Sequence, residues 1–209
     1  NIYNSQNIPT PAPFQQDIAI CNGNPNLGNN FAYVDNPTLF NEINSTGSNV
    51  YFFTNLSNPE NSLLSSWFEG QLNYNGVTCD VWWVYIPSGI GANSNLTIYM
   101  HVGPQDTNYY QQYYPYVGVS AYWYCYSEGY PNMASCPNYG IYDNGKQVFN
   151  FYDNFAGTSL NYYEWGGDEG AYSVFSTDNE LIIDSNSPEF YFIYIDTCLL
   201  YTSPSPRDS

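Results

Sequence analysis

The chain has 209 residues, of which 43% are hydrophobic and 20% aromatic, and this share of core-forming side chains excludes an intrinsically disordered protein. Nineteen acidic residues against only two basic ones, Lys146 and Arg207, give a formal net charge of −17. Nucleic acids and anionic membranes are therefore excluded as partners, because both are bound through clustered basic side chains. No run of about 18 apolar residues occurs, so the sequence predicts no membrane span.

Charged residues of both signs make up only 10% of the chain, so Asn, Ser, Thr, Gln and Tyr must cover most of its surface. Such a surface is typical of a secreted protein rather than a cytosolic enzyme. The near absence of Lys and Arg suggests the hypothesis that the protein works in acid or under a glycan coat, where surface ion pairs contribute little. No basic and apolar leader precedes Asn1, so an exported protein would be numbered here from its mature end.

The first strand is expected behind the prolines of residues 9–13, which favour extended backbone and disfavour helix. Alternate side chains from Phe14 to Ile20 would share one face of this strand. Further strands are predicted, in chain order, by NVYFFTNL (49–56), LLSSWFEGQLN (63–73), CDVWWVYIP (79–87) and NLTIYMHV (95–102). VWWVYI is apolar on both faces and predicts a central strand, whereas the alternation from Leu96 to Val102 predicts one buried and one outward face.

The rest of the chain continues this pattern of short strands. A Tyr-rich connector (103–118) and a turn at Asp143-Asn144-Gly145 lead to short runs at 171–177, 180–184 and 190–195, which recur at roughly ten-residue spacing. No window shows a convincing helical repeat. The sequence therefore predicts an all-β protein, an antiparallel β-sandwich of jelly-roll or Ig type, or two such sandwiches packed together.

The cysteines predict two structural disulfides in an oxidising compartment. Cys125 and Cys136 stand eleven positions apart around a Gly-Tyr-Pro-Asn turn, a spacing that a hairpin disulfide closes easily. Cys21 and Cys79 are expected to form the second pair, with free buried thiols as the alternative for all four. No CxxC pair or His-rich ligand set accompanies them, so no zinc site is expected.

Three sequons for N-linked glycans begin at Asn44, Asn55 and Asn95, each in or beside a turn-rich stretch. In an Asn-rich chain some sequons arise by chance. Three of them in a secreted chain favour glycosylation.

Four stretches resemble an archaeal cell-surface family known as domain of unknown function 2341. They are NSQNIPTPAPFQQDI (4–18), WFEG (67–70), VWWVYIPSGIGANSNLTIYM (81–100) and YGIYDNGKQVFNFYDNFAGTSL (139–160). The resemblance implies an exported protein of the cell envelope and carries over no catalytic residue. The stretch FYDNFAGTSLNYYEW (151–165) also resembles the opening of concanavalin-like, laminin-G-like jelly rolls, which implies a β-sandwich surface domain at 1–145 and the truncated start of a concanavalin-like domain at 146–197.

The last residues differ in character from everything before them. Cys198 to Asp208 resembles the translation of a transposase sequencing adapter, so residues 198–209 are expected to be an artefact of a sequencing read. On this interpretation the natural sequence visible here ends near Thr197, the true C-terminus is missing, and the source is an environmental metagenome. Cys198 and Arg207 then carry no functional argument, and four cysteines remain.

The candidate catalytic residues do not form a recognisable site. His101, the single histidine, lies on the outward face of its strand without a triad or metal cluster around it. Asp168 and Glu169 are neighbours on a strand and point apart, whereas a glycosidase needs two carboxyls that face each other. We therefore expect no enzyme.

We expect no cofactor and no metal site either. The alternative is Ca²⁺ held by the loops DNPT (35–38), YDNG (142–145) or STDNE (176–180), although turns use the same residues for backbone reasons. The tyrosines of the connector could form a sugar-stacking platform, a subunit interface or a packed connector, and these interpretations stay open. They are Tyr109, Tyr110, Tyr113, Tyr114 and Tyr116.

The leading hypothesis is a structural subunit of an extracellular filament, pilus-like or cell-surface assembly, which would have copies of itself and N-linked glycans as partners. Residues 1–20 would lend a strand to the open sheet edge of a neighbouring subunit, or else pair within their own sandwich. The subunit interface would then comprise Ile2, Tyr3, Ile8, Phe14, Ile18 and Ile20. The alternatives are a secreted carbohydrate-binding adhesin and a secreted hydrolase whose catalytic carboxylates lie beyond this sequence.

Overall fold

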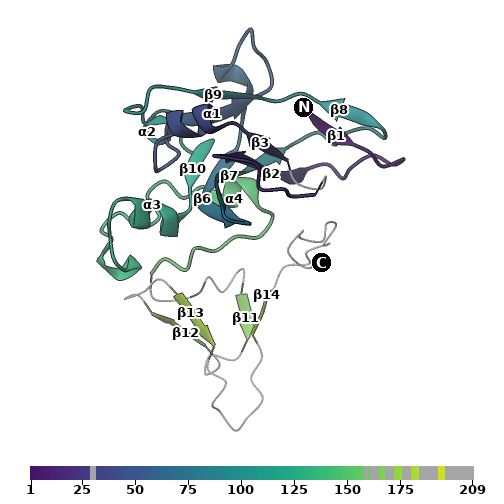
Figure 1. Cartoon of the computed structure of the whole chain (residues 1–209). Helices are drawn as coiled ribbons and strands as arrows, with labels where there is room; N and C mark the ends of the chain where they lie inside the picture. The colour runs from purple at the N-terminus through teal and green to yellow at the C-terminus, as the bar shows by residue number, and fades with distance from the viewer. Residues whose placement is uncertain are drawn as a thin grey trace.

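The computed structural model describes residues 1–28, 32–157 and 160, together with the strand segments 165–167, 172–175, 180–183 and 193–195. Figure 1 shows the arrangement of the elements. The predicted adapter tail at 198–209 and the carboxylates Asp168 and Glu169 lie outside the described residues.

A mixed five-stranded sheet is the largest element of the fold. Its strands, in spatial order, are β10 (Val117–Val119), β6 (Ser66–Tyr74), β7 (Val77–Ile86), β2 (Phe14–Cys21) and β3 (Tyr33–Asp35). β7 pairs antiparallel with both β6 and β2, so the VWWVYI run is a central strand as predicted. The two short outer strands β3 and β10 run parallel to their neighbours β2 and β6.

A smaller antiparallel sheet packs against the large one. It consists of β5 (Leu63–Leu64), β4 (Val50–Phe53) and β9 (Tyr99–Val102). Phe52 of β4 meets the ring of Trp82 at a centroid distance of 5.9 Å, and Phe68 meets the same ring at 4.6 Å. All three rings are at most 1% exposed, and each contributes about 2–3 kcal/mol of burial free energy to the core.

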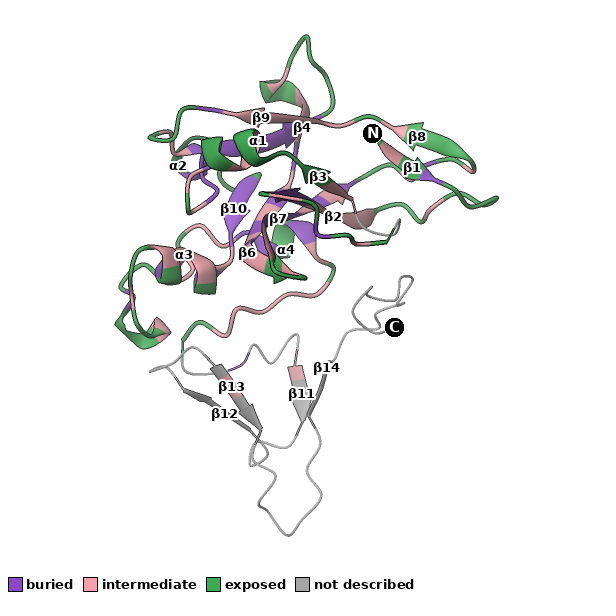
Figure 2. Ribbon diagram, viewed as in Figure 1, coloured by how far each residue is buried: buried purple, intermediate pink, exposed green. Residues whose placement is uncertain are grey.

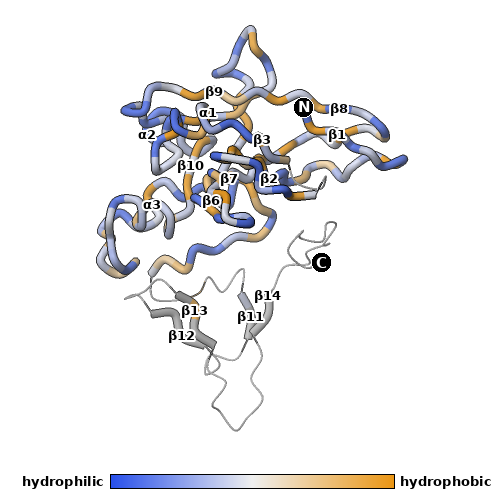
Figure 3. The backbone as a smooth tube through the Cα atoms, viewed as in Figure 1, coloured by the Kyte–Doolittle hydropathy of each residue, from blue (hydrophilic) through white to orange (hydrophobic). Residues whose placement is uncertain are grey.

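The core therefore lies between two sheets, which confirms the predicted all-β sandwich. Figure 2 shows buried residues concentrated on the strands of both sheets, and Figure 3 shows hydrophobic residues along the same strands. The predicted inward face of residues 96–102 is also confirmed, because Leu96, Ile98, Met100 and Val102 pack against this core.

In the described part of the chain, four short helices and two 3₁₀ turns connect the strands, although no window of the sequence shows a convincing helical repeat. The helices are α1 (Pro37–Glu42), α2 (Tyr109–Tyr113), α3 (Ala121–Ser127) and α4 (Gly145–Val148), and the turns are η1 (Glu60–Ser62) and η2 (Met133–Ser135). Side chains of Asn36, Asn108 and Ser120 cap the first three helices, each by accepting a hydrogen bond from the backbone N–H of the third helical residue. These helices are too short for a 3.6-residue repeat to show in the sequence.

The N-terminal segment pairs within its own chain. β1 (Ile2–Asn4) runs antiparallel to β8 (Ser94–Leu96), with Ile2 opposite Leu96. The buried side chain of Asn4 fastens this ribbon, because its Nδ2 donates to the carbonyl oxygens of Ile8 at 2.8 Å, Ile90 at 3.2 Å and Gly91 at 3.1 Å. The alternative that this segment pairs within its own sandwich is therefore the one found in the folded chain.

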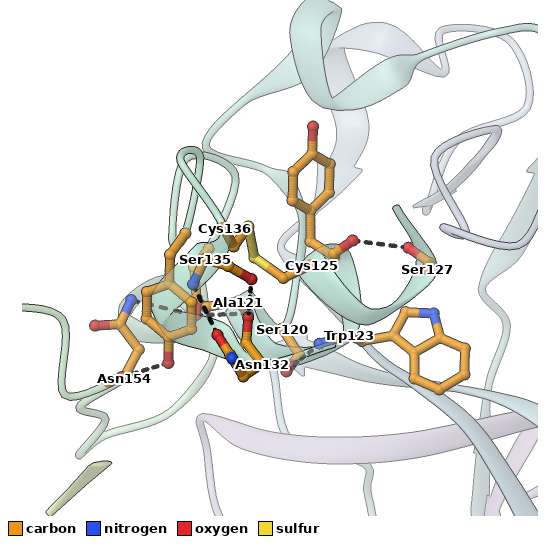
Figure 4. Close-up of a disulfide and its surroundings, with 12 residues drawn as sticks. Ser120, Ala121, Trp123, Cys125, Ser127, Asn132, Ser135, Cys136 and Asn154 are labelled. Atoms are coloured by element: carbon orange, nitrogen blue, oxygen red, sulfur yellow. Dashed lines mark hydrogen bonds between the residues drawn. A yellow bond between two sulfur atoms is a disulfide. The ribbon is translucent and has the colours of Figure 1, made fainter. Parts of the chain in front are cut away.

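Both predicted disulfides are present. Cys21 and Cys79 face each other across β2 and β7 and close a loop of 58 residues, which stabilises the fold by about 4 kcal/mol in the chain-entropy model. Cys125 of α3 joins Cys136, which directly follows η2 (Figure 4). Both sulfur pairs are buried, with at most 7% of any of the four residues exposed.

Beyond residue 157, the structure describes two separate two-stranded ladders. β11 (Trp165–Gly167) pairs with β14 (Ile193–Ile195), and β12 (Tyr172–Phe175) pairs with β13 (Glu180–Ile183). The three runs predicted as strands in this part of the chain therefore contain strands. Across the described ranges, no helix has the length and apolar character needed to cross a membrane.

Candidate binding pocket and predicted site residues

A polar pocket of about 220 Å³ lies where α4 and the end of the Tyr-rich connector meet. Its lining comprises Tyr114, Asp143, Asn144, Lys146, Gln147, Tyr152 and Asn154. The volume is below the 300 Å³ or more that is typical of drug-sized ligands, so the pocket fits one small group, such as a single sugar ring.

The Asp143 carboxylate at the base of this pocket accepts hydrogen bonds from three separate parts of the chain. Oδ1 accepts from the Trp67 indole nitrogen at 3.0 Å and from the Gly145 backbone nitrogen at 3.0 Å. Oδ2 accepts from the Tyr152 hydroxyl at 2.7 Å, the Ala121 backbone nitrogen at 3.1 Å and Asn154 Nδ2 at 3.3 Å. One carboxylate thus ties together β6, the start of α3 and residues 145–154.

These five hydrogen bonds limit the chemical roles that are open to the Asp143 carboxylate. A carboxylate has about four lone-pair sites, and all of them are used inside the protein. Burial, and the charge of the adjacent Asp143, raise the pKa of Tyr152 far above its ordinary value, so this hydroxyl stays protonated and donates. Asp143 is therefore a structural hydrogen-bond acceptor. Its carboxylate has no acceptor site left with which to bind a metal ion or to act as a general base.

Asn144 is more deeply buried than Asp143, at 2% exposure. Its Nδ2 donates to the carbonyl oxygens of Pro115 at 2.8 Å and Ser66 at 3.0 Å, which joins α4 to β6 and to the connector. A Cβ atom at Gly118 would lie 2.2 Å from Asn144 Oδ1, so this contact requires glycine in β10. The predicted turn at residues 143–145 is thus the anchored start of a short helix.

The exposed groups of this site are at the mouth of the pocket. Tyr114 is 49% exposed as a residue, and Lys146 and Gln147 are exposed as well. An exposed aromatic face with nearby amide and ammonium donors suits a hydroxyl-rich neutral ligand or a small anion. The sequence pointed to Tyr114, but no local signal links it to Lys146, which is 32 positions further along the chain.

The predicted tyrosine platform divides into a buried and an exposed part. Tyr109 and Tyr110 are 9% and 1% exposed, so the interpretation as a packed connector holds for them. Tyr113 is partly buried and donates to Glu60 at 2.9 Å; desolvation and this bond raise its pKa to about 12. Tyr114 and Tyr116 are about half exposed and remain candidates for a contact surface.

His101 belongs to the aromatic cluster that covers the outer face of the small sheet. Its ring stacks on Tyr51 at a centroid distance of 4.7 Å, and its Nε2 lies 3.0 Å from the Tyr109 hydroxyl. Both neighbours are less than 10% exposed, so the imidazole forms part of a packed layer. The outward orientation is as predicted, but tyrosines cover the side chain.

The three predicted glycosylation sites differ in their surroundings. Asn55 and Asn95 are exposed, and both remain predicted glycan acceptors. Asn44 is partly buried, and its Nδ2 donates to Ser48 Oγ at 2.9 Å and to the Gln105 carbonyl at 3.1 Å. A glycan at Asn44 would displace these contacts, so the structure favours a structural role there.

The predicted interface residues separate into two groups. Phe14, Ile18 and Ile20 lie on β2, which pairs with β7 along its whole length and with β3 at residues 19–21, and they pack in their own core, with Ile20 only 2% exposed. Their packing favours a role in the core of their own chain over one in an interface between subunits. Ile2 and Tyr3 lie on β1, and Tyr3 and Ile8 are 57% and 66% exposed, so these three remain interface candidates.

Within the described ranges, no group of three or more His, Cys, Asp or Glu residues is placed to hold a metal ion. Of the proposed calcium loops, DNPT provides the cap of α1 through Asn36, and YDNG contains the saturated Asp143. Most of STDNE lies outside the described residues.

No family model matches the chain, and no solved structure matches it significantly. A curated relative from Sulfolobus islandicus rod-shaped virus 1, "Uncharacterized protein 562", is 35% identical over 154 residues, which is 73% of this chain. The chain spans about a fifth of that relative, 21% of its length. The resemblances to domain of unknown function 2341 and to laminin-G-like domains stay predictions.

Proposed function

We propose that this chain is part of a structural protein that forms the surface of an extracellular filament or particle. The observation that carries the proposal is that disulfides and multiple hydrogen bonds hold its loops and terminal segment to the strands. One disulfide joins β2 to β7 and another braces the loop after α3, while Asn4 and Asp143 each bind several segments that are distant in the sequence. Such fastening suits a protein that must keep its shape in an oxidising medium without the protection of a cell.

The charge and the relative support the same proposal. A net charge of −17 on a surface made mostly of Asn, Ser, Thr and Tyr is compatible with secretion and glycosylation at Asn55 and Asn95. The relative is a protein of a virus whose name describes it as rod-shaped, and an elongated particle is one kind of assembly that a structural subunit could build. We therefore infer a role in coat or filament architecture rather than in chemistry.

Assembly by strand exchange would use β1. In this mode β1 leaves its own β8 and takes the same register on β8 of the next copy, so that Ile2 again faces Leu96. Deleting residues 1–13 removes β1 and the Asn4 contacts but leaves β2 and both disulfides in place. The shortened chain is expected to stay folded and to form no filaments, as judged by circular dichroism and negative-stain electron microscopy.

The matched control for this deletion is Asn7→Ser, which changes an exposed side chain outside the proposed interface and keeps the whole backbone of the N-terminal segment. Main-chain bonds supply most of the affinity in strand exchange, so this variant is expected to form filaments. If filaments of the deletion variant equal those of the full chain, strand exchange by β1 is ruled out while the structural role itself is retained.

A carbohydrate-binding adhesin is the second candidate, and the pocket beside Asp143 is the observation that favours it. If the protein binds sugars there, Tyr114→Ala is expected to weaken binding on a glycan array by about tenfold or more, because the exposed ring forms one wall of the pocket. Tyr116→Ala is the control, since Tyr116 is equally exposed at 52% but does not line the pocket. Equal losses in the two variants, or no glycan binding by the intact chain, would count against the adhesin. Loss of glycan binding on chelation would point to Ca²⁺ as a bound ion.

A further inference from the structure

Several long stretches of this acidic chain carry almost no charged residue, and the one from Thr107 to Tyr142 is also rich in tyrosine. The 36 residues from Thr107 to Tyr142 contain a single charged side chain, Glu128, although the whole chain has a net charge of −17. The same stretch, which we call the tyrosine lobe, holds 11 of the 24 tyrosines. It comprises α2, β10, α3, η2 and the loops between them, and Figure 1 shows α3 and the loop after it projecting from the sheets.

Two tyrosines on α3 point away from the core of this lobe. Tyr122 and Tyr126 are 55% and 56% exposed, and their rings are 6.1 Å apart and nearly parallel, at 10°. Their separation of four positions places them on one face of α3, whereas Ala121 and Cys125 face inward at 2% and 0% exposure. We call these two side chains the Tyr122–Tyr126 pair.

The helix beneath the pair is held firmly. Cys125 is bonded to Cys136 on its inner side (Figure 4). Trp123 packs over Gly70 of β6 and donates its indole N–H to the Ser45 carbonyl at 2.8 Å. A Cβ atom at position 70, where φ is +130°, would lie 2.5 Å from the Trp123 ring, so glycine allows this close approach. Because α3 is fixed, little conformational entropy would be lost when a partner covers its outer face.

We propose that the Tyr122–Tyr126 pair is a contact surface between copies of this chain, an inference that rests on the proposed structural role. Two copies that each carry a net charge of −17 repel one another, so they can approach closely only where the surface lacks charge. The tyrosine lobe is such a surface. Tyrosine is also enriched in protein interfaces, since it combines a large apolar ring with a hydroxyl that can donate to backbone carbonyls.

The same argument sets the conditions under which the contact forms. Protonation of exposed carboxylates in acid lowers the repulsion, and added salt screens it. Self-association of the intact chain is therefore expected to strengthen from pH 8 to pH 4, and at pH 8 it is expected to strengthen with added salt.

The test compares the full chain with Tyr122→Ser/Tyr126→Ser by sedimentation velocity and electron microscopy over a range of protein concentrations at both pH values. The double variant is expected to need at least about tenfold more protein for half-maximal association, since paired aromatic anchors dominate interface energies. The matched control is Val34→Ser/Leu56→Ser, which removes two apolar side chains that are 43% and 63% exposed outside the tyrosine lobe. This control is expected to associate like the full chain, and circular dichroism checks that both variants fold.

The outcomes separate this inference from the function on which it rests. If the double variant associates as well as the full chain, the contact surface is elsewhere while the structural role is retained. A full chain that stays monomeric at every pH and salt concentration overturns both. A monomeric chain whose binding to a glycan array is lost in the double variant would make the pair a sugar-binding surface and would also overturn the proposal.

Discussion

An Asp143→Ala variant is expected to lose about 3 kcal/mol of unfolding free energy, because one substitution leaves five donors without their acceptor. Three of these donors, from Trp67, Ala121 and Tyr152, lie in segments that are distant from one another in the sequence. The site is only partly buried, so water satisfies some of the donors and keeps the loss below the sum of five buried bonds. Urea unfolding followed by tryptophan fluorescence measures the change.

Two further variants isolate the cause of this loss. Asp143→Asn keeps one acceptor oxygen but turns an amide nitrogen toward backbone donors, so it is expected to lose about half as much as the alanine variant. Asp35→Ala removes an exposed carboxylate and is expected to change stability by less than about 0.5 kcal/mol. Limited proteolysis of Asp143→Ala should cut first within residues 145–157, and uniform resistance there would show that Asp143 does not anchor this segment.

Most of the strands could be predicted because their signals are local. Residues 81–86 form a continuous apolar run with β-branched and aromatic side chains, which fits a strand buried on both faces. Residues 95–102 alternate with a period of two, which fits a half-buried strand. A further local signal lies at Asn75-Gly76, which joins β6 to β7 with φ values of 52° and 86°, as a two-residue hairpin turn requires.

The helices and the pocket could not be predicted in the same way. α1 to α4 have between 4 and 7 residues, so they end before a helical repeat is established, and only the capping residues Asn36, Asn108 and Ser120 point to them. The Asp143 contacts join positions as far apart in the sequence as Trp67 and Asn154. Such contacts depend on the packing of the whole sandwich. The sequence Asp143-Asn144-Gly145 therefore predicts a turn but not the set of hydrogen bonds that Asp143 accepts.

The sequence also could not show that β2 is a central strand. Its alternation from Phe14 to Ile20 fits a strand that pairs with a neighbouring subunit as well as one that pairs within its own chain, because both cases bury the same face. In the structure β2 pairs with β7 of its own chain, and the Cys21–Cys79 disulfide joins the same two strands, so β2 belongs to its own sandwich. Of the two strands described within residues 1–20, β1, which has three residues and lies outside the two sandwich sheets, is the candidate for exchange.

Asp80 is expected to make the protein more stable in weak acid than at neutral pH. This carboxyl on β7 is 1% exposed, between Ile20 of β2 and Gln71 of β6, and its Oδ1 has no hydrogen-bond partner. Burial raises its pKa from 3.8 to about 7, although the Gln71 side chain opposes the shift by bonding to it. The Asp80 charge in turn helps to raise the pKa of the buried Tyr110, whose hydroxyl therefore stays neutral at this pH.

The direction of the pH effect follows from the two pKa values of Asp80. Below its unfolded pKa of about 3.8, the carboxyl is protonated in both states and imposes no penalty. As the pH rises from about 4 to 7, the unfolded chain ionises while the folded chain keeps its proton, and the unfolding free energy falls by up to about 4 kcal/mol. Above pH 7 both states are ionised and the penalty is constant.

The Asp80→Asn variant tests this assignment against the general effect of the net charge. Since an asparagine side chain cannot ionise, the variant is expected to be more stable than the natural chain at pH 8 and to lose most of the slope between pH 4 and pH 7, measured by thermal unfolding at each pH. Asp106→Asn removes an exposed carboxylate instead, so it should leave the slope almost unchanged. Parallel profiles for the natural chain and Asp80→Asn would assign the pH dependence to repulsion among surface carboxylates. A flattened profile in Asp80→Asn alone would show that the buried Asp80 carboxyl makes the fold more stable in acid. Greater stability in acid would agree with the hypothesis, based on the scarcity of basic residues, that the protein works in acid.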